Sequence, residues 1–70
     1  MDDILMYRLK VRGIVSESEL NAITSVQSLD VMMDDENTSF SVSTDQSGLI
    51  GLLRQLNGRG LVLLSVNCEY

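Results

Sequence analysis

The chain has 70 residues, of which 44 % are hydrophobic and 21 % charged, a composition typical of one folded domain spanning residues 1–70. Ten acidic residues against five basic ones give a net charge of −5, which argues against nucleic acid as a partner because phosphate binding needs a local excess of Lys and Arg. No apolar run approaches the ~20 residues that span a bilayer, and the start, MDDILM, is acidic where a signal peptide is basic, so we expect a cytoplasmic protein with no membrane partner.

The first predicted element is a strand that begins at Tyr7, after a loose tail at residues 1–5. Its sequence, YRLKVRG, alternates apolar residues with three of the five basic residues of the chain, Arg8, Lys10 and Arg12. This alternation predicts a half-buried strand with one solvent-exposed face. Gly13 interrupts the pattern and predicts a bulge or a close approach of two backbones.

A short helix is predicted next. Ser16 and Glu19 have the spacing of a capping box, in which each side chain satisfies the backbone amide of the other. From Leu20 onward, apolar residues recur at helical spacing and form a narrow stripe. The pattern predicts about ten residues of helix, ending near Gln27.

Residues 28–43 predict a hairpin of two strands. Leu29, Val31 and Met33 alternate along the first strand, and Phe40 and Val42 alternate with serines along the second. The connecting sequence, DDEN at 34–37, gathers three carboxylates but lacks the spacing and the glycine of a calcium loop. We therefore expect a solvated turn and no metal site.

The second helix is predicted to follow Asp45, a favourable N-cap residue. NGRG at 57–60 ends it, because glycine accepts the left-handed conformation that follows a helix. Glycine inside a helix costs about 1 kcal/mol relative to alanine, so Gly48 and Gly51 imply either tight packing of the helix against its neighbours or an exposed glycine face that receives a partner. LVLLSVNC, at 61–68, is the last predicted strand.

The predicted fold is α+β and ferredoxin-like, with the element order β-α-β-β-α-β. Right-handed crossovers give a four-stranded antiparallel sheet in the order 4-1-3-2, with both helices on one face. A domain this small buries only about 60 % of its unfolded surface, so association with a second copy or with a partner would add stability.

The face of the sheet without helices carries the basic stripe, defined as Arg8, Lys10 and Arg12. Strict alternation also places Leu61, Leu63 and Met32 on this face, and it directs Leu29 and Leu64 toward the helices and the core. A contiguous exposed apolar patch usually marks an interface. The three charges can also serve only to solvate an exposed strand face. The sequence therefore leaves two interpretations open for the basic stripe, a protein interface and a solvated surface. The predicted protein-contact set is Arg8, Lys10, Arg12, Leu61 and Leu63.

The side chains that carry catalysis and metal binding are scarce. The chain has no histidine and one cysteine, Cys68, so we expect no catalytic residue, no cofactor and no metal ligand. Cys68 itself is predicted to be a small apolar core residue. A small-ligand regulatory domain of the amino-acid-sensing (ACT) type has the same topology and would bind an effector at the first strand-to-helix loop, where Gly13 and Ser16 lie.

Two stretches carry a family resemblance: YRLKVRG near the start, and DQSGLIGLLRQLNGRGLVLLSV from Asp45 to Val66. They resemble the YRIRVRG-like first strand and the DQxxLxGLLxxLxxxGLxLLSV-like C-terminal half of a family of short, stand-alone bacterial proteins. The resemblance covers about half of the chain. It implies a compact α+β domain of a family with no assigned activity.

These observations predict a non-enzymatic module that acts by protein association, as a homodimer or docked on another protein, through the helix-free face of its sheet. The alternative function is a small-molecule-sensing regulatory domain of the ACT-like type, with its ligand at Gly13 and Ser16.

Overall fold

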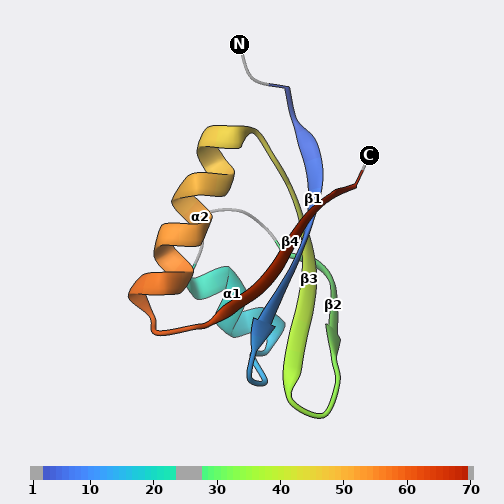
Figure 1. Cartoon of the computed structure of the whole chain (residues 1–70), viewed down its shortest axis with the longest axis vertical. Coiled ribbons are helices and arrows are strands. Elements are labelled where there is room, and N and C mark those ends of the chain that lie inside the picture. Colours follow the sequence, from blue (N-terminus) through green and yellow to red (C-terminus); the bar gives the residue numbers. More distant parts are fainter. Residues whose placement is uncertain (1–2, 24–27, 70) are drawn as a thin grey trace.

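A computed structural model describes residues 3–23 and 28–69 (Figure 1). Its elements are β1 (Leu5–Arg12), α1 (Glu17–Ile23), β2 (Leu29–Met33), β3 (Asn37–Thr44), α2 (Gln46–Gly58) and β4 (Leu63–Glu69). The predicted order of strands and helices is confirmed. Strand β1 begins inside the predicted tail, because Leu5 already pairs with Thr44. The predicted end of the first helix, near Gln27, lies outside the described residues.

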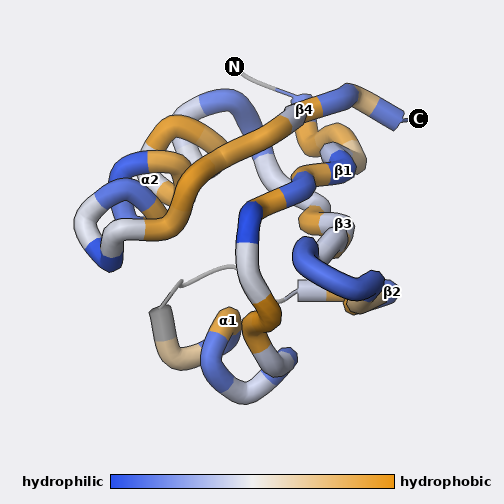
Figure 2. Tube along the Cα trace, turned by 60° about the horizontal axis from the view of Figure 1, so that its bottom comes forward, coloured by the Kyte–Doolittle hydropathy of each residue, from blue (hydrophilic) through white to orange (hydrophobic). Residues whose placement is uncertain are grey.

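The four strands form one antiparallel sheet in the order β2-β3-β1-β4. This is the predicted order 4-1-3-2 read from the other edge. The central strands β1 and β3 pair without interruption from Leu5 opposite Thr44 to Arg12 opposite Asn37. Both helices lie on the same side of the sheet, with α2 alongside β4 (Figures 1 and 2). The result is an α+β fold of the ferredoxin-like type, with one face of the sheet free of helices.

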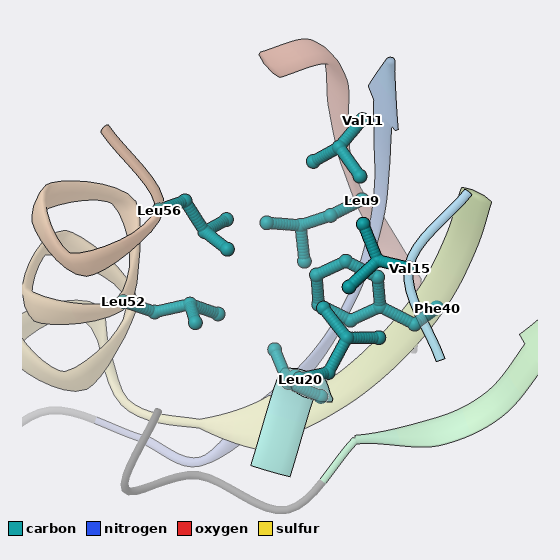
Figure 3. Packing of buried hydrophobic residues seen from close by; sticks show 8 residues of the cluster. Leu9, Val11, Val15, Leu20, Phe40, Leu52 and Leu56 are labelled. Carbon is teal, nitrogen blue, oxygen red and sulfur yellow. The ribbon is translucent and has the colours of Figure 1, made fainter. Parts of the chain in front are cut away.

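The core lies between the two helices and the central strands. Leu52 and Leu56 project from α2 toward Leu9 of β1 and Phe40 of β3 (Figure 3). Each fully buried side chain of this size stabilises the fold by roughly 1.5–3 kcal/mol relative to an exposed one. The buried apolar residues are Leu9, Val11, Val15, Leu20, Phe40, Val42, Leu52 and Leu56.

The predicted helix starts are confirmed by their capping bonds. The Oγ of Ser16 accepts a hydrogen bond from the Glu19 amide at 3.2 Å, and the Oδ1 of Asp45 accepts one from the Gly48 amide at 2.7 Å. A Cβ on Gly48 would overlap the Oγ1 of Thr44, so this glycine is required by close packing. Tight packing is not the reason for Gly51, where a Cβ would meet nothing within 4 Å.

A bulge in β4 changes which side chains face the helices. Val11 pairs with Leu63, and Lys10 pairs with Ser65. Leu64 is therefore an extra residue that has no pairing partner on β1. An extra residue reverses the alternation on one side of it. Leu63, predicted on the helix-free face, therefore shares the helix-facing side of Val11, and Leu64, predicted in the core, is exposed.

A second bulge interrupts β2. Leu29 pairs with Ser41 and Met32 pairs with Ser39, so two residues of β2 lie opposite one of β3. Asp30 has a φ of +49°, in the left-handed region that Asp and Asn tolerate better than most residues. Leu29, predicted to face the helices, consequently lies on the side of Ser41, away from them.

Candidate functional site

The helix-free face of the sheet carries an open hollow of about 650 Å³. The hollow spans the sheet from the bulge of β2 to the end of β4. Two methionines supply apolar surface, and a guanidinium and two carboxylates lie among its polar groups. Its lining residues are Met6, Arg8, Asp30, Val31, Met32, Ser41 and Glu69.

The guanidinium of Arg8 is held in place inside this hollow. Its Nη1 donates to the backbone carbonyl of Asp30 and to the Oγ of Ser41, each at 3.0 Å. The first of these bonds depends on the bulge of β2, where Asp30 adopts its left-handed conformation. The side chain of Arg8 is thus bound to β3, the neighbour of β1, and to β2 beyond it, which lowers the conformational entropy that Arg8 would lose on binding a partner.

A chain of hydrogen bonds joins all four strands on this face. The Oγ of Ser41 accepts from Arg8 and donates to the Oε1 of Glu69 at 3.3 Å. Ser41 is only 4 % exposed although no helix covers it, because Arg8 and Glu69 lie over its hydroxyl. The chain runs from Asp30 on β2 through Arg8 and Ser41 on the central strands to Glu69 on β4.

Arg8 keeps hydrogen-bonding capacity for a ligand. Within residues 3–23 and 28–69, its Nε and Nη2 donate to no other group. These two nitrogens form the fork that binds a carboxylate through two parallel bonds. Met6 and Met32, the latter 64 % exposed, line the same hollow as Arg8. Methionine adapts its shape to varied apolar partners.

The rest of the basic stripe continues along β1 on the same face. Lys10 lies opposite Ser39, and the exposed Arg12 lies opposite Asn37 near the β2–β3 turn. Neither side chain forms a hydrogen bond or ion pair in the part of the chain that the structure describes. The side chains of Lys10 and Arg12 can therefore form hydrogen bonds with a partner.

The acidic turn at 34–37 is organised by one carboxylate. The Oδ1 of Asp34 accepts from the amides of Glu36 at 3.1 Å and Asn37 at 2.8 Å. These two hydrogen bonds, and to a smaller extent the positive charge of Lys10, lower the pKa of Asp34 below its ordinary value. The turn is built as a hairpin connection, and no group of three or more His, Cys, Asp or Glu side chains among the described residues could hold a metal ion.

The depressed pKa of Asp34 predicts how stability depends on pH. The folded pKa lies below the unfolded value of about 3.9, so the ionised carboxylate stabilises the fold. This contribution is complete above the unfolded pKa and is lost as pH falls through the folded one. We expect the difference in free energy of unfolding between the wild type and Asp34→Asn to be constant above about pH 5 and to shrink toward pH 2.

Urea unfolding followed by circular dichroism at stepped pH values measures this difference. Asp35→Asn changes the net charge by the same amount one residue away and corrects for general charge effects. If the difference between the wild type and Asp34→Asn grows as the pH is lowered, the assigned direction is wrong.

The predicted ligand loop uses its polar atoms within the chain. Gly13, with a φ of +98°, donates to the carbonyl of Glu36 at 2.6 Å and accepts from the Thr38 hydroxyl at 2.7 Å. The same hydroxyl accepts from the Val15 amide at 2.9 Å, and the Oγ of Ser16 caps α1. Groups that would bind an effector are thus engaged in closing the loop onto β3.

The structure separates the predicted protein-contact set into two places. Arg8, Lys10 and Arg12 lie together on the helix-free face. Leu61 precedes β4 and packs against the core, and Leu63 lies beside it. Both leucines line a different hollow, of about 430 Å³, at the C-terminal end of α2. The reason is the bulge at Leu64, which the alternating pattern of the sequence does not reveal.

Several residues of the site were not predicted from the sequence. The alternation of the sequence indicates no face for Met6 and no binding role for Ser41 or Glu69. The signal for the bulge of β2 was present, because Val31, Met32 and Met33 are consecutive apolar residues where strict alternation requires a polar one.

Comparison with protein-family models, with curated proteins and with solved structures finds no match to this chain. The resemblance of its two ends to a bacterial family stays a prediction from the sequence. Within the described residues, the helices are too short or too polar to cross a membrane.

Proposed function

We propose that this protein is a non-enzymatic, cytoplasmic binding module that docks a segment of another protein on the helix-free face of its sheet. The observation that carries the proposal is Arg8, which lines an open hollow and is bound by its Nη1 to Asp30 and Ser41, while its Nε and Nη2 donate to no other group of the described residues. A fixed guanidinium in a hollow that two methionines also line suits a partner that offers a carboxylate next to an apolar side chain.

The charges on this face define the partner further. Glu69 and Asp34 lie near enough to offset part of the charge of Arg8 and of Lys10, whereas Arg12 forms no hydrogen bond or ion pair within the described residues and adds positive charge toward the β2–β3 turn. An acidic segment would therefore place its apolar side chain between Met6 and Met32 and its further carboxylates along the basic stripe. Exposed basic residues of this kind steer association and fix orientation.

The small-molecule-sensing alternative has less support. The polar atoms at Gly13 and Ser16 are used to close the loop and to cap α1. A ligand there would have to replace bonds that the fold itself needs. No specific observation favours this function over docking on the helix-free face.

The test begins with selection of binders from a random-peptide phage library on the immobilised protein. We expect the enriched peptides to carry Asp or Glu beside a large apolar residue. Binding of a selected peptide, followed by fluorescence anisotropy, should weaken about 10- to 100-fold in Arg8→Ser, the range for loss of hydrogen bonds to a charged group. It should also weaken as salt is raised.

Matched variants show whether the loss of peptide binding is specific to the hollow and the basic stripe. Arg54→Ser removes the same charge from an exposed position on α2 and should change affinity less than about twofold. If Arg8→Ser disturbs the fold, Arg12→Ser and Met32→Ser probe the stripe and the hollow separately. Peptides without acidic residues, or equal losses in Arg8→Ser and Arg54→Ser, would contradict the proposal.

A further inference from the structure

The two edge strands of the sheet differ in how they are protected against pairing with another strand. β2 has five residues, a bulge at its middle and Asp30 in the left-handed conformation, features that discourage pairing. The bulge of β4 lies at its start instead, so residues 65–69 pair without interruption with residues 6–10 of β1. The outer side of this regular segment is a free edge.

The sequence of this edge does not protect it either. Residues 61–68 contain no charged residue and no proline, the two residue types that block unwanted pairing. Val62 is 48 % exposed and Leu64 is 41 % exposed. Figure 2 shows this apolar stretch running alongside α2 and leading into β4. Cys68, predicted to lie in the core, is exposed on the same strand.

We propose that β4 pairs antiparallel with β4 of a second copy of this chain, which extends the sheet across a two-fold axis. The net charge of −5 opposes contact between two copies over acidic surfaces, whereas residues 61–68 bring no charge to the contact. In a pairing centred on Val66 or Asn67, Glu69 of each copy lies opposite an uncharged residue of the other. Two β4 strands can therefore pair without repulsion between their charges, and each covers exposed apolar residues of the other.

The arrangement has a consequence for the helix-free face. A two-fold axis that relates neighbouring antiparallel strands is perpendicular to the sheet, so both helix-free faces lie on the same side of the dimer. The inference does not rest on the proposed function, because the edge of β4 and the hollow around Arg8 are different surfaces. If both hold, one dimer presents two hollows to a partner with two acidic segments.

The test is the solution mass of the protein over a wide concentration range, by light scattering and sedimentation, in the presence of a reducing agent. We expect the mass to double with concentration. Cys68→Lys should raise the dissociation constant at least about tenfold, because lysine on an edge strand opposes pairing. Cys68→Ser tests the loss of the thiol alone, and Met32→Lys adds the same charge to the other edge strand; both should stay within about twofold of the wild type.

A measurement without variants gives a second readout. Amide hydrogen exchange of residues 63–69 should slow as the protein concentration rises, while exchange in β2 stays constant. A monomer up to about millimolar concentration, a dimer that Met32→Lys weakens as much as Cys68→Lys, or concentration-dependent protection in β2 alone would each overturn the inference. Peptide binding to the Arg8 hollow is scored separately, so either proposal can fail without the other.

Discussion

Phe40→Ala is expected to unfold the protein in water at 25 °C. Phe40 is the largest fully buried side chain, and it lies on the central strand β3 facing Leu9 and the helices (Figure 3). Truncation of a buried phenylalanine costs about 3–5 kcal/mol, through lost transfer free energy and the cavity left behind. A core of this size rarely supplies more than ~3–5 kcal/mol of net stability, so the loss equals the whole margin. Far-UV circular dichroism should show loss of the folded spectrum.

Two further variants calibrate this result. Phe40→Leu leaves a smaller cavity and should keep a cooperative urea transition at a lower midpoint. Ile50→Ala truncates a residue of α2 that is 46 % exposed and should change the free energy of unfolding by less than about 1 kcal/mol. A folded Phe40→Ala with a stability close to that of Ile50→Ala would show that the packing in Figure 3 does not describe the core.

Thr38→Val is expected to lower the free energy of unfolding by about 2–6 kcal/mol, at about 1–3 kcal/mol for each of two buried backbone groups left without a partner. The Thr38 side chain is fully buried, and its hydroxyl donates to the carbonyl of Gly13 and accepts from the amide of Val15. Valine has nearly the same shape, so packing is kept while both backbone groups lose their bond. The loop between β1 and α1 should loosen as a result.

Urea unfolding measures the loss of stability, and amide exchange of Val15 reports the loop directly. The Val15 amide should exchange faster in Thr38→Val than the global loss of stability explains. Ser39→Ala is the control, because Ser39 is next in sequence and its hydroxyl has no partner among residues 3–23 and 28–69. Unchanged protection of Val15 in Thr38→Val would show that the threonine hydroxyl does not hold the loop.

Several features of the fold and of the candidate site could be predicted from the sequence. The alternation of YRLKVRG was enough to place Arg8, Lys10 and Arg12 on the face opposite Leu9 and Val11, because side chains on a strand point to opposite faces in turn. Ser16 and Asp45 were identified as helix caps because capping is a contact of a few residues along the chain. The position of Gly60, at a φ of +77°, followed from the same local rule.

The position of each bulge was beyond this reasoning, although the consecutive apolar residues 31–33 signal that alternation breaks somewhere in β2. An extra residue in a strand costs little locally, and whether it forms depends on the strand opposite, which the local pattern does not contain. The bulge at Leu64 moved Leu63 away from the basic stripe, and the bulge at Asp30 turned Leu29 toward Ser41. The carbonyl of Asp30 binds Arg8 only because β2 and β1 are brought to opposite sides of β3.

The sequence by itself therefore determined the order of the elements, their caps and the basic face, all of which depend on neighbours within one turn or one strand. The tertiary structure alone decided the hollow around Arg8, the separation of Leu61 and Leu63 from it, and the unprotected edge of β4. These depend on register and strand order, which are set when residues far apart in the chain pack into one core.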